Sequence, residues 1–191
     1  MKNIKIFLLV ILFSENFSYS IYANGSDSTN LFNGISLSYV PNGGQLGVEK
    51  YYLQSNKYKI IGSAHLIYQR FPNYYSSVGL IYSNSLRRTN KLGIYNEHGF
   101  QIGYLGSYYD FDMYKTKSDG SIVNIGRKWT SSMIIGYFIG LGYDFSKHTK
   151  INLKLFVKPG IYYRFPNNDN VFYLNNYSIE IGLIFHPKWF K

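Results

Sequence analysis

Residues 133 to 145 read MIIGYFIGLGYDF and alternate large apolar side chains with small or polar ones at a period of two. Such alternation is typical of a β-strand with one apolar and one polar face. The same period continues in INLKLFVKPGIYYRF, residues 151 to 165, and in YSIEIGLIF, residues 177 to 185. Each stretch carries at least one charged residue opposite its apolar face. A continuous apolar face with charges behind it favours a transmembrane β-barrel, with lipid outside and a polar lumen inside.

The composition fits a single membrane domain. At 191 residues the chain has the length of one domain. Aromatic residues make up 19% of it, with 21 tyrosines, whereas charged residues make up only 16%. Tyrosine suits the boundary between lipid tails and headgroups. We expect a girdle of tyrosines near strand ends on the outer face, formed by Tyr39, Tyr52, Tyr68, Tyr82, Tyr137, Tyr143, Tyr163 and Tyr177.

The first residues resemble a secretory signal. Lys2 and Lys5 form a basic start, residues 6 to 13 are apolar, and a small-residue cleavage site follows Ser20 or Ala23. The apolar run is too short for a membrane span, which takes about 20 residues. We therefore predict a signal peptide over residues 1–23 and an outer-membrane β-barrel domain over residues 24–191. The chain has no cysteine, which excludes disulfides and a lipidated cysteine.

The net charge of +10 raises the question of an anionic partner. Lysines and arginines are scattered over predicted strands and turns without a dense run, so nucleic acid is not expected. The expected partners are outer-membrane lipid and lipopolysaccharide, the outer-membrane assembly machinery and an unidentified surface ligand. No cofactor and no metal are expected, because no thiol is present and the four histidines are far apart in sequence.

The alternation predicts about eight strands in an all-β, single antiparallel barrel. Before the three C-terminal strands, four periodic segments begin near Gly34, Leu46, Tyr58 and Ser77. The pattern breaks between Asn84 and Gly99, which indicates a loop. A fifth strand begins at Phe100, and its apolar residues change parity, which predicts a β-bulge near Gly106.

An even strand number places both ends of the barrel domain on the periplasmic side. Long outer loops should then alternate with short inner turns. Residues 115–128 and 165–176 fit outer loops, and residues 55–57 and 146–149 fit inner turns. Pro159 is expected to face outward within a strand, where its missing N–H interrupts the backbone ladder.

The best candidate site is a set of charges predicted to face the lumen: Glu49, Lys154, Lys158, Arg164 and Glu180, with His65 and Asp144 nearby. The interior of an eight-stranded barrel is just wide enough to be filled by side chains. Buried charges must pair, and adjacent strands bring Glu180 toward Lys158. We interpret the set as a salt-bridged plug; a binding or conducting lumen is the alternative.

An enzyme acting on lipid A, as a hydrolase or an acyltransferase, is the main functional alternative. It would need a serine or histidine nucleophile system near the outer rim. His98 is the best candidate, but its neighbour Glu97 would point to the opposite face of a strand. His65 has Ser63 two residues before it and no serine two residues after it. We therefore assign no catalytic residue.

Several C-terminal motifs carry a family resemblance. The segments GLGYDFSK at residues 140–147, LKLFVKPG at 153–160, YRFPN at 163–167 and SIEIG at 178–182 resemble uncharacterised small outer-membrane β-barrel proteins of Bacteroidota, within the porin and OmpA-like barrel superfamily. The likeness covers about the C-terminal half. It implies an outer-membrane barrel without an assigned activity.

The sequence therefore predicts a small outer-membrane barrel with a structural or surface-binding role and no evident catalysis. Two further alternatives remain open. One is a narrow transport channel, which requires an open lumen. The other is a secreted lipocalin-like barrel or β-sandwich, in which the apolar face would turn inward and the charges outward.

Overall fold

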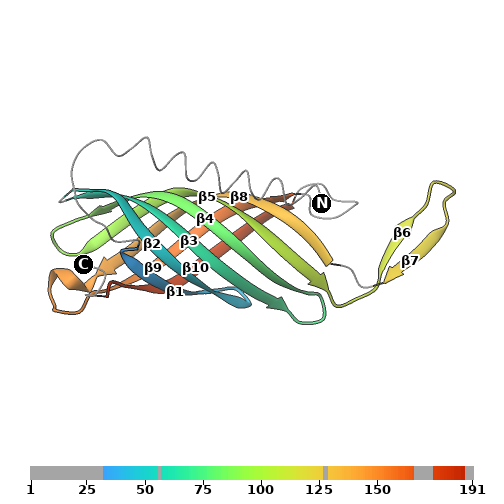
Figure 1. Cartoon of the computed structure of the whole chain (residues 1–191), viewed down its shortest axis with the longest axis horizontal. Coiled ribbons are helices and arrows are strands. Elements are labelled where there is room, and N and C mark those ends of the chain that lie inside the picture. Colours follow the sequence, from blue (N-terminus) through green and yellow to red (C-terminus); the bar gives the residue numbers. More distant parts are fainter. Residues whose placement is uncertain (1–31, 56, 127–128, 166–173, 188–191) are drawn as a thin grey trace.

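The computed structural model describes residues 32–55, 57–126, 129–165 and 174–187. The predicted signal peptide and the loop segment 166–173 lie outside these residues. Eight strands close into one antiparallel barrel, and two more form a separate hairpin, β6 and β7 (Figure 1). The barrel strands are β1 (Gly34–Val40), β2 (Gly43–Gln54), β3 (Tyr58–Phe71), β4 (Tyr75–Thr89), β5 (Ile94–Tyr109), β8 (Trp129–Asp144), β9 (Leu153–Phe165) and β10 (Leu174–Phe185). The predicted fold class is confirmed.

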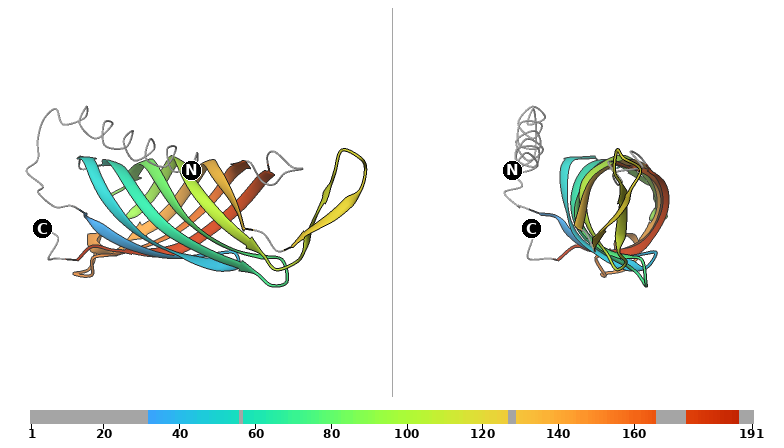
Figure 2. Two further views of the ribbon diagram at one scale, coloured as in Figure 1. Left: turned by 45° about the vertical axis from the view of Figure 1, so that its right-hand side comes forward. Right: turned by 90° about the vertical axis from the view of Figure 1, so that its right-hand side faces the viewer.

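The strands follow one another around the ring in the order β1-β10-β9-β8-β5-β4-β3-β2, so β1 and β10 close the barrel. Figure 2 shows the closed ring when the molecule is viewed end-on. The hairpin of β6 (Met113–Thr116) and β7 (Ile122–Gly126) extends beyond one end of the barrel, which we call the hairpin end (Figure 1). The other end, which carries the short 3-10 helix η1 (Phe145–Lys147), is called the η1 end.

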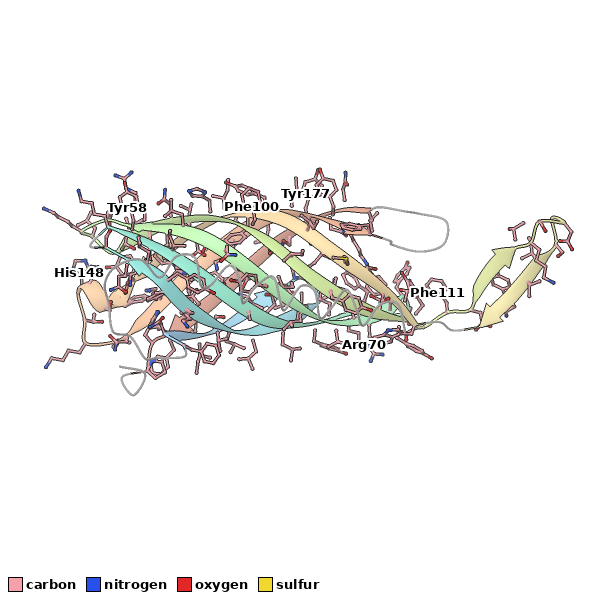
Figure 3. The ribbon with its side chains drawn as sticks, turned by 45° about the horizontal axis from the view of Figure 1, so that its top comes forward. Tyr58, Arg70, Phe100, Phe111, His148 and Tyr177 are labelled. Carbon is pink, nitrogen blue, oxygen red and sulfur yellow. The ribbon has the colours of Figure 1, made fainter. Side chains whose placement is uncertain are left out.

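The outer face of the barrel is apolar. Phe100 is 69% exposed, and Figure 3 shows Phe100 and Tyr177 pointing away from the ribbon. Large exposed apolar patches of this kind mark lipid or partner contact in a folded protein. Exposed large apolar side chains occur on every barrel strand and include Leu37, Leu46, Leu66, Leu80, Ile94, Ile139, Leu141, Val157 and Ile179. The lipocalin-like alternative is therefore wrong, because it would place this face inside.

The predicted tyrosine girdle lies on the outside, but Tyr82 and Tyr137 lie near the middle of β4 and β8 and not near strand ends. Tyr39, Tyr68, Tyr137, Tyr163 and Tyr177 are exposed. The remaining three are half-buried on the same face. Tyr52 and Tyr82 are two of these three, and their hydroxyl oxygens lie 3.0 Å apart.

The predicted loop between Asn84 and Gly99 is wrong. β4 continues to Thr89 and β5 begins at Ile94, so only a short turn separates them, and Gly93 in that turn has φ +82°. The predicted bulge near Gly106 is also wrong, since β5 pairs with both neighbours in unbroken register there. The apolar residues of β5 change parity for another reason: the side chain of Tyr109 points into the lumen and is buried. The register of β2 and β3 does shift, between Tyr51 and Leu53.

The hairpin end has unequal connections. The predicted loop 115–128 contains most of the β6–β7 hairpin and is therefore not a plain loop. The connections from β1 to β2 and from β3 to β4 are tight turns, in which Asn42 and Asn73 have φ of +62° and +65°. Asparagine tolerates this left-handed conformation better than most residues. The expected alternation of long and short connections thus fails at these two turns.

Pro159 interrupts one ladder as expected. It pairs in register with Ile179 of β10. On its other side, the β8–β9 pairing stops after Phe138↔Gly160 and resumes at Leu141↔Val157.

Candidate functional site

Arg87 is the centre of a buried ion cluster in the lumen, in the half nearer the η1 end. Its guanidinium donates to both oxygens of Glu49, with distances of 2.8 Å from Nη2 to Oε1 and 3.3 Å from Nη1 to Oε2. Its Nε and Nη2 lie 2.8 and 2.7 Å from Oε2 of Glu97. Forked contacts of this kind are the strongest that a carboxylate makes with a side chain. The three residues come from β4, β2 and β5, so the cluster ties together separate parts of the wall.

Lys158 of β9 completes this cluster. Its Nζ lies 3.4 Å from Oε1 of Glu97 and 4.5 Å from the centre of the Phe156 ring. Ser85 donates a hydrogen bond of 2.8 Å to the same oxygen of Glu97. Arg87, Lys158, Glu49 and Glu97, hereafter the ion cluster, contain two cations and two anions. Their formal charges cancel, as burial requires.

The local sequence makes room for these long side chains. Gly140 and Gly142 are small residues of β8 on its lumen side. A Cβ at Gly140 would lie 3.1 Å from Cγ of Lys158, and one at Gly142 would lie 2.3 Å from the Tyr95 ring. The glycines that alternate with bulky residues in β8 therefore provide space for lumen side chains, as the sequence suggested.

A second group of polar side chains lies beyond the ion cluster toward the η1 end. Lys154 Nζ donates to the hydroxyl of Tyr51 at 3.0 Å and lies 3.8 Å from Oδ2 of Asp144. His186, just after β10, contacts the same hydroxyl and lies 3.3 Å from Lys154 Nζ. Burial, and then the neighbouring Lys154, lower the pKa of His186 to about 3. The imidazole is therefore neutral at pH 7 and accepts a hydrogen bond at Nε2.

The other two predicted lumen charges lie apart from the ion cluster. Arg164 is buried toward the hairpin end, where it donates to Ser132 at 2.9 Å and to Ser107 at 2.7 Å. Glu180 lies opposite Lys158 in the β9–β10 register. Its side chain instead accepts a hydrogen bond of 2.6 Å from Ser38, while the ammonium of Lys158 lies near Glu97. The expected Glu180–Lys158 pair is thus a register neighbour and not the contact that Lys158 makes.

Apolar side chains close the lumen nearer the hairpin end. A buried group, hereafter the apolar plug, packs there with Tyr162 against it and consists of Val40, Ile67, Ile81, Leu105 and Ile134. The cavity between this plug and the ion cluster has a volume of about 40 Å³. A water needs roughly 10 to 15 Å³ of such space, so the cavity has room for only a few waters. The middle of the described barrel therefore holds little space for water.

The histidines considered for catalysis lie in unsuitable positions. His98 is exposed on the outer face of β5, whereas Glu97 faces the lumen, so the two cannot act together. His65 is buried in the lumen, but the nearby Ser63 bonds to Ser83, with 2.9 Å between the hydroxyls. The structure therefore gives the lipid A enzyme no histidine–serine pair at these positions.

Sequence reasoning found Glu49, Lys154 and Lys158 but missed Arg87 as a lumen residue. It noted Glu97 only as a neighbour of His98. Both lie in the segment interpreted as a loop. A signal was available, since Ser83, Ser85 and Arg87 share one parity, and all three are buried.

The described residues contain no group of three or more histidine, cysteine, aspartate or glutamate side chains placed to hold a metal ion. The same part of the chain contains no helix long and apolar enough to cross a membrane.

No protein-family model matches the chain, and no curated protein sequence matches it. Among solved structures the chain is similar to Neisserial surface protein A, with 13% identity over 81% of this chain and 92% of that one, at a TM-score of 0.44. It is also similar to the N-terminal β-barrel domain of Pseudomonas aeruginosa OprF, with 15% identity over 81% and 97% of the two chains, at a TM-score of 0.34. The NanC porin gives 10% identity over 81% and 100%, at 0.17. Similarity at this level carries no argument about activity, and the barrel assignment follows from the strand pairing. The relation to Bacteroidota proteins stays a prediction.

Proposed function

We propose that this protein is an outer-membrane barrel with a sealed lumen, which anchors the β6–β7 hairpin as a binding surface outside the cell. The observation that carries the proposal is that the ion cluster and the apolar plug together fill the lumen. With only about 40 Å³ of space between them, the barrel wall is suited to anchoring and not to conduction.

The apolar outer face supports the membrane location. Strands of about 9 to 11 residues suffice to cross a bilayer. β4, β5 and β8 have 15, 16 and 16 residues, so they are long enough to cross the bilayer and to project beyond it. A barrel is one of the two structures that can cross a membrane with all backbone groups paired.

The hairpin supports the surface role. It projects past the barrel (Figure 1), and its side chains Tyr114 and Ile122 are 61% and 71% exposed. A turn at its tip is held by Asp119, which accepts hydrogen bonds from the backbone N–H and hydroxyl of Ser121. These bonds also lower the pKa of the Asp119 carboxyl. The tip is thus an ordered, charged turn.

The first test concerns assembly and conductance. The protein should fractionate with outer membranes and migrate differently in SDS gels with and without boiling, as a folded barrel does. In planar bilayers it should give no discrete conductance. Steady single-channel steps from the folded protein would contradict the sealed lumen and favour the channel alternative.

The second test concerns orientation. A protease recognition site inserted between Asp119 and Gly120 should be cleaved in intact cells, because a side chain at Gly120 would meet only open space. The matched insertion between Lys147 and His148 at the η1 end should be cleaved only after the outer membrane is permeabilised. The reverse pattern would place the hairpin in the periplasm.

A further inference from the structure

The lumen opens at the η1 end into two adjoining cavities of about 330 and 280 Å³. They share Gln54, Lys59, Asp144 and Ser146, so they form one mouth, hereafter the vestibule. The vestibule is several times larger than the cavity in the middle of the barrel. It therefore offers much more space to a small ligand than the cavity in the middle of the barrel.

The charged side chains that line the vestibule are mostly cationic. Four lysines contribute, namely Lys57, Lys59, Lys147 and Lys154, against one carboxylate, Asp144. Their formal charges sum to +3. The ion cluster deeper in the lumen is balanced, with two cations and two anions, and so does not neutralise this excess.

Two of the lysines share one aromatic ring. Lys59 Nζ lies 4.2 Å from the centre of the Tyr51 ring, and Lys154 Nζ lies 5.5 Å from it. The Tyr51 ring thus lies within reach of two like charges at the floor of the vestibule. An anion near Lys59 would offset part of this local positive charge.

The single carboxylate is already engaged. Asp144 Oδ1 accepts hydrogen bonds from the backbone N–H and the hydroxyl of Ser146, at 3.1 and 2.6 Å. Its Oδ2 lies 3.8 Å from Lys154. Because Asp144 already interacts with Ser146 and Lys154, it does not neutralise the other vestibule lysines. These lysines can therefore bind an external anion.

We infer that the vestibule binds a phosphate group, held by Lys59 at its floor and by Lys57 and Lys147 at its rim. A dianion offsets two of the three excess charges, and lysine ammonium groups bind phosphate as point charges. The group is either free inorganic phosphate or the phosphate monoester of a lipid headgroup, which share this chemistry.

The test is a calorimetric titration of the full mature protein in a phosphate-free glycoside detergent at constant ionic strength. Inorganic phosphate and glycerol 3-phosphate are the two probes, with chloride as reference. Lys59→Gln should weaken phosphate binding about tenfold, in line with the loss of one charge-assisted contact. Lys57→Gln and Lys147→Gln together should give a smaller loss, because both side chains are exposed.

The matched control is Lys91→Gln. Lys91 is exposed in the β4–β5 turn at the same end and lines neither cavity, so this variant removes one charge without touching the vestibule. Its affinity should match that of the parent protein. Each variant is first checked for heat-modifiable migration, so that only folded barrels are compared.

Binding of either probe that Lys59→Gln weakens and Lys91→Gln does not would support the inference. Equal affinity for both probes would indicate free phosphate as a sufficient ligand, whereas preference for glycerol 3-phosphate would indicate a headgroup. No binding above the chloride reference, or equal loss in Lys59→Gln and Lys91→Gln, would overturn it. The sealed lumen and the surface hairpin do not depend on this result.

Discussion

The two halves of the lumen are filled by different chemistry. Toward the η1 end, Arg87 and Lys158 neutralise Glu49 and Glu97 by specific pairing. Toward the hairpin end, the apolar plug packs uncharged side chains, and the buried Arg164 bonds to the hydroxyls of Ser132 and Ser107. An ion cluster depends on each of its members, because a lost partner leaves a buried charge unpaired. An apolar plug loses only the packing of the group removed.

The largest effect should follow from Arg87→Met. This change leaves two carboxylates in the lumen without their shared guanidinium, and we expect the free energy of unfolding to fall by about 3–5 kcal/mol. Urea unfolding of the protein in lipid vesicles measures the change. Adding Glu49→Gln to the same chain should recover most of the loss, since Lys158 and Glu97 then remain as a balanced pair. If this double variant were no more stable than Arg87→Met, charge pairing would not be what stabilises this half of the lumen.

A smaller effect should follow from Leu105→Ala in the apolar plug. Removing a buried leucine side chain costs about 2–4 kcal/mol when the surroundings cannot collapse into the space. Ile134→Val, which removes one methylene, should cost about 1 kcal/mol by the same measurement. A loss for Leu105→Ala as large as that for Arg87→Met would remove the distinction between the two halves.

The pH dependence should come from the η1 half. His186 has a pKa of about 3 in the folded protein and 6.5 when unperturbed. Between these values the unfolded chain binds more protons, so stability is highest above pH 6.5 and falls as the pH drops toward 3. We expect His186 to contribute about 3 kcal/mol of the loss between pH 7 and pH 4. The His186→Gln variant should not show this loss of stability when its unfolding in vesicles is measured between pH 7 and pH 4. The Ile134→Val variant should still show it.

The smallest effect should follow from His98→Ala. His98 lies on the outer face, away from the ion cluster and the apolar plug, so the free energy of unfolding should change by less than about 0.5 kcal/mol. Heat-modifiable migration should also be unchanged. Loss of a lipid A-modifying activity in this variant, with the barrel still assembled, would instead support the enzyme alternative.

The sequence predicts the lumen-facing residues most accurately in strands whose outer face is apolar. Lys154 and Lys158 alternate with Leu153, Leu155 and Val157, and the pattern identifies both lysines. Around Arg87 the outward residues include Asn84 and Arg88, so both faces are polar and the period of two is hidden. Strands of 15 and 16 residues are longer than a bilayer requires, so parts of their outer faces do not need to be apolar.

The partners in the ion cluster were not predictable from parity alone. Parity assigns a residue to the lumen but does not say which residues meet across it. The Glu180–Lys158 expectation used strand adjacency, whereas Lys158 reaches Glu97 on β5. β5 is separated from β9 by β8 in the ring. In a narrow barrel, long side chains therefore select partners across the lumen, and register along one strand pair cannot identify them.

The pairing of β1 with β10 has a consequence for how the chain folds. This ladder joins five residue pairs, against fifteen between β4 and β5. It also joins Ile35 to Phe185, the most distant pairing in the barrel. Contacts between residues far apart in sequence carry the highest loop-closure entropy and form slowly. The ring is therefore completed by a short and distant strand pair, and closure of this seam is expected to be the late, rate-limiting event of folding.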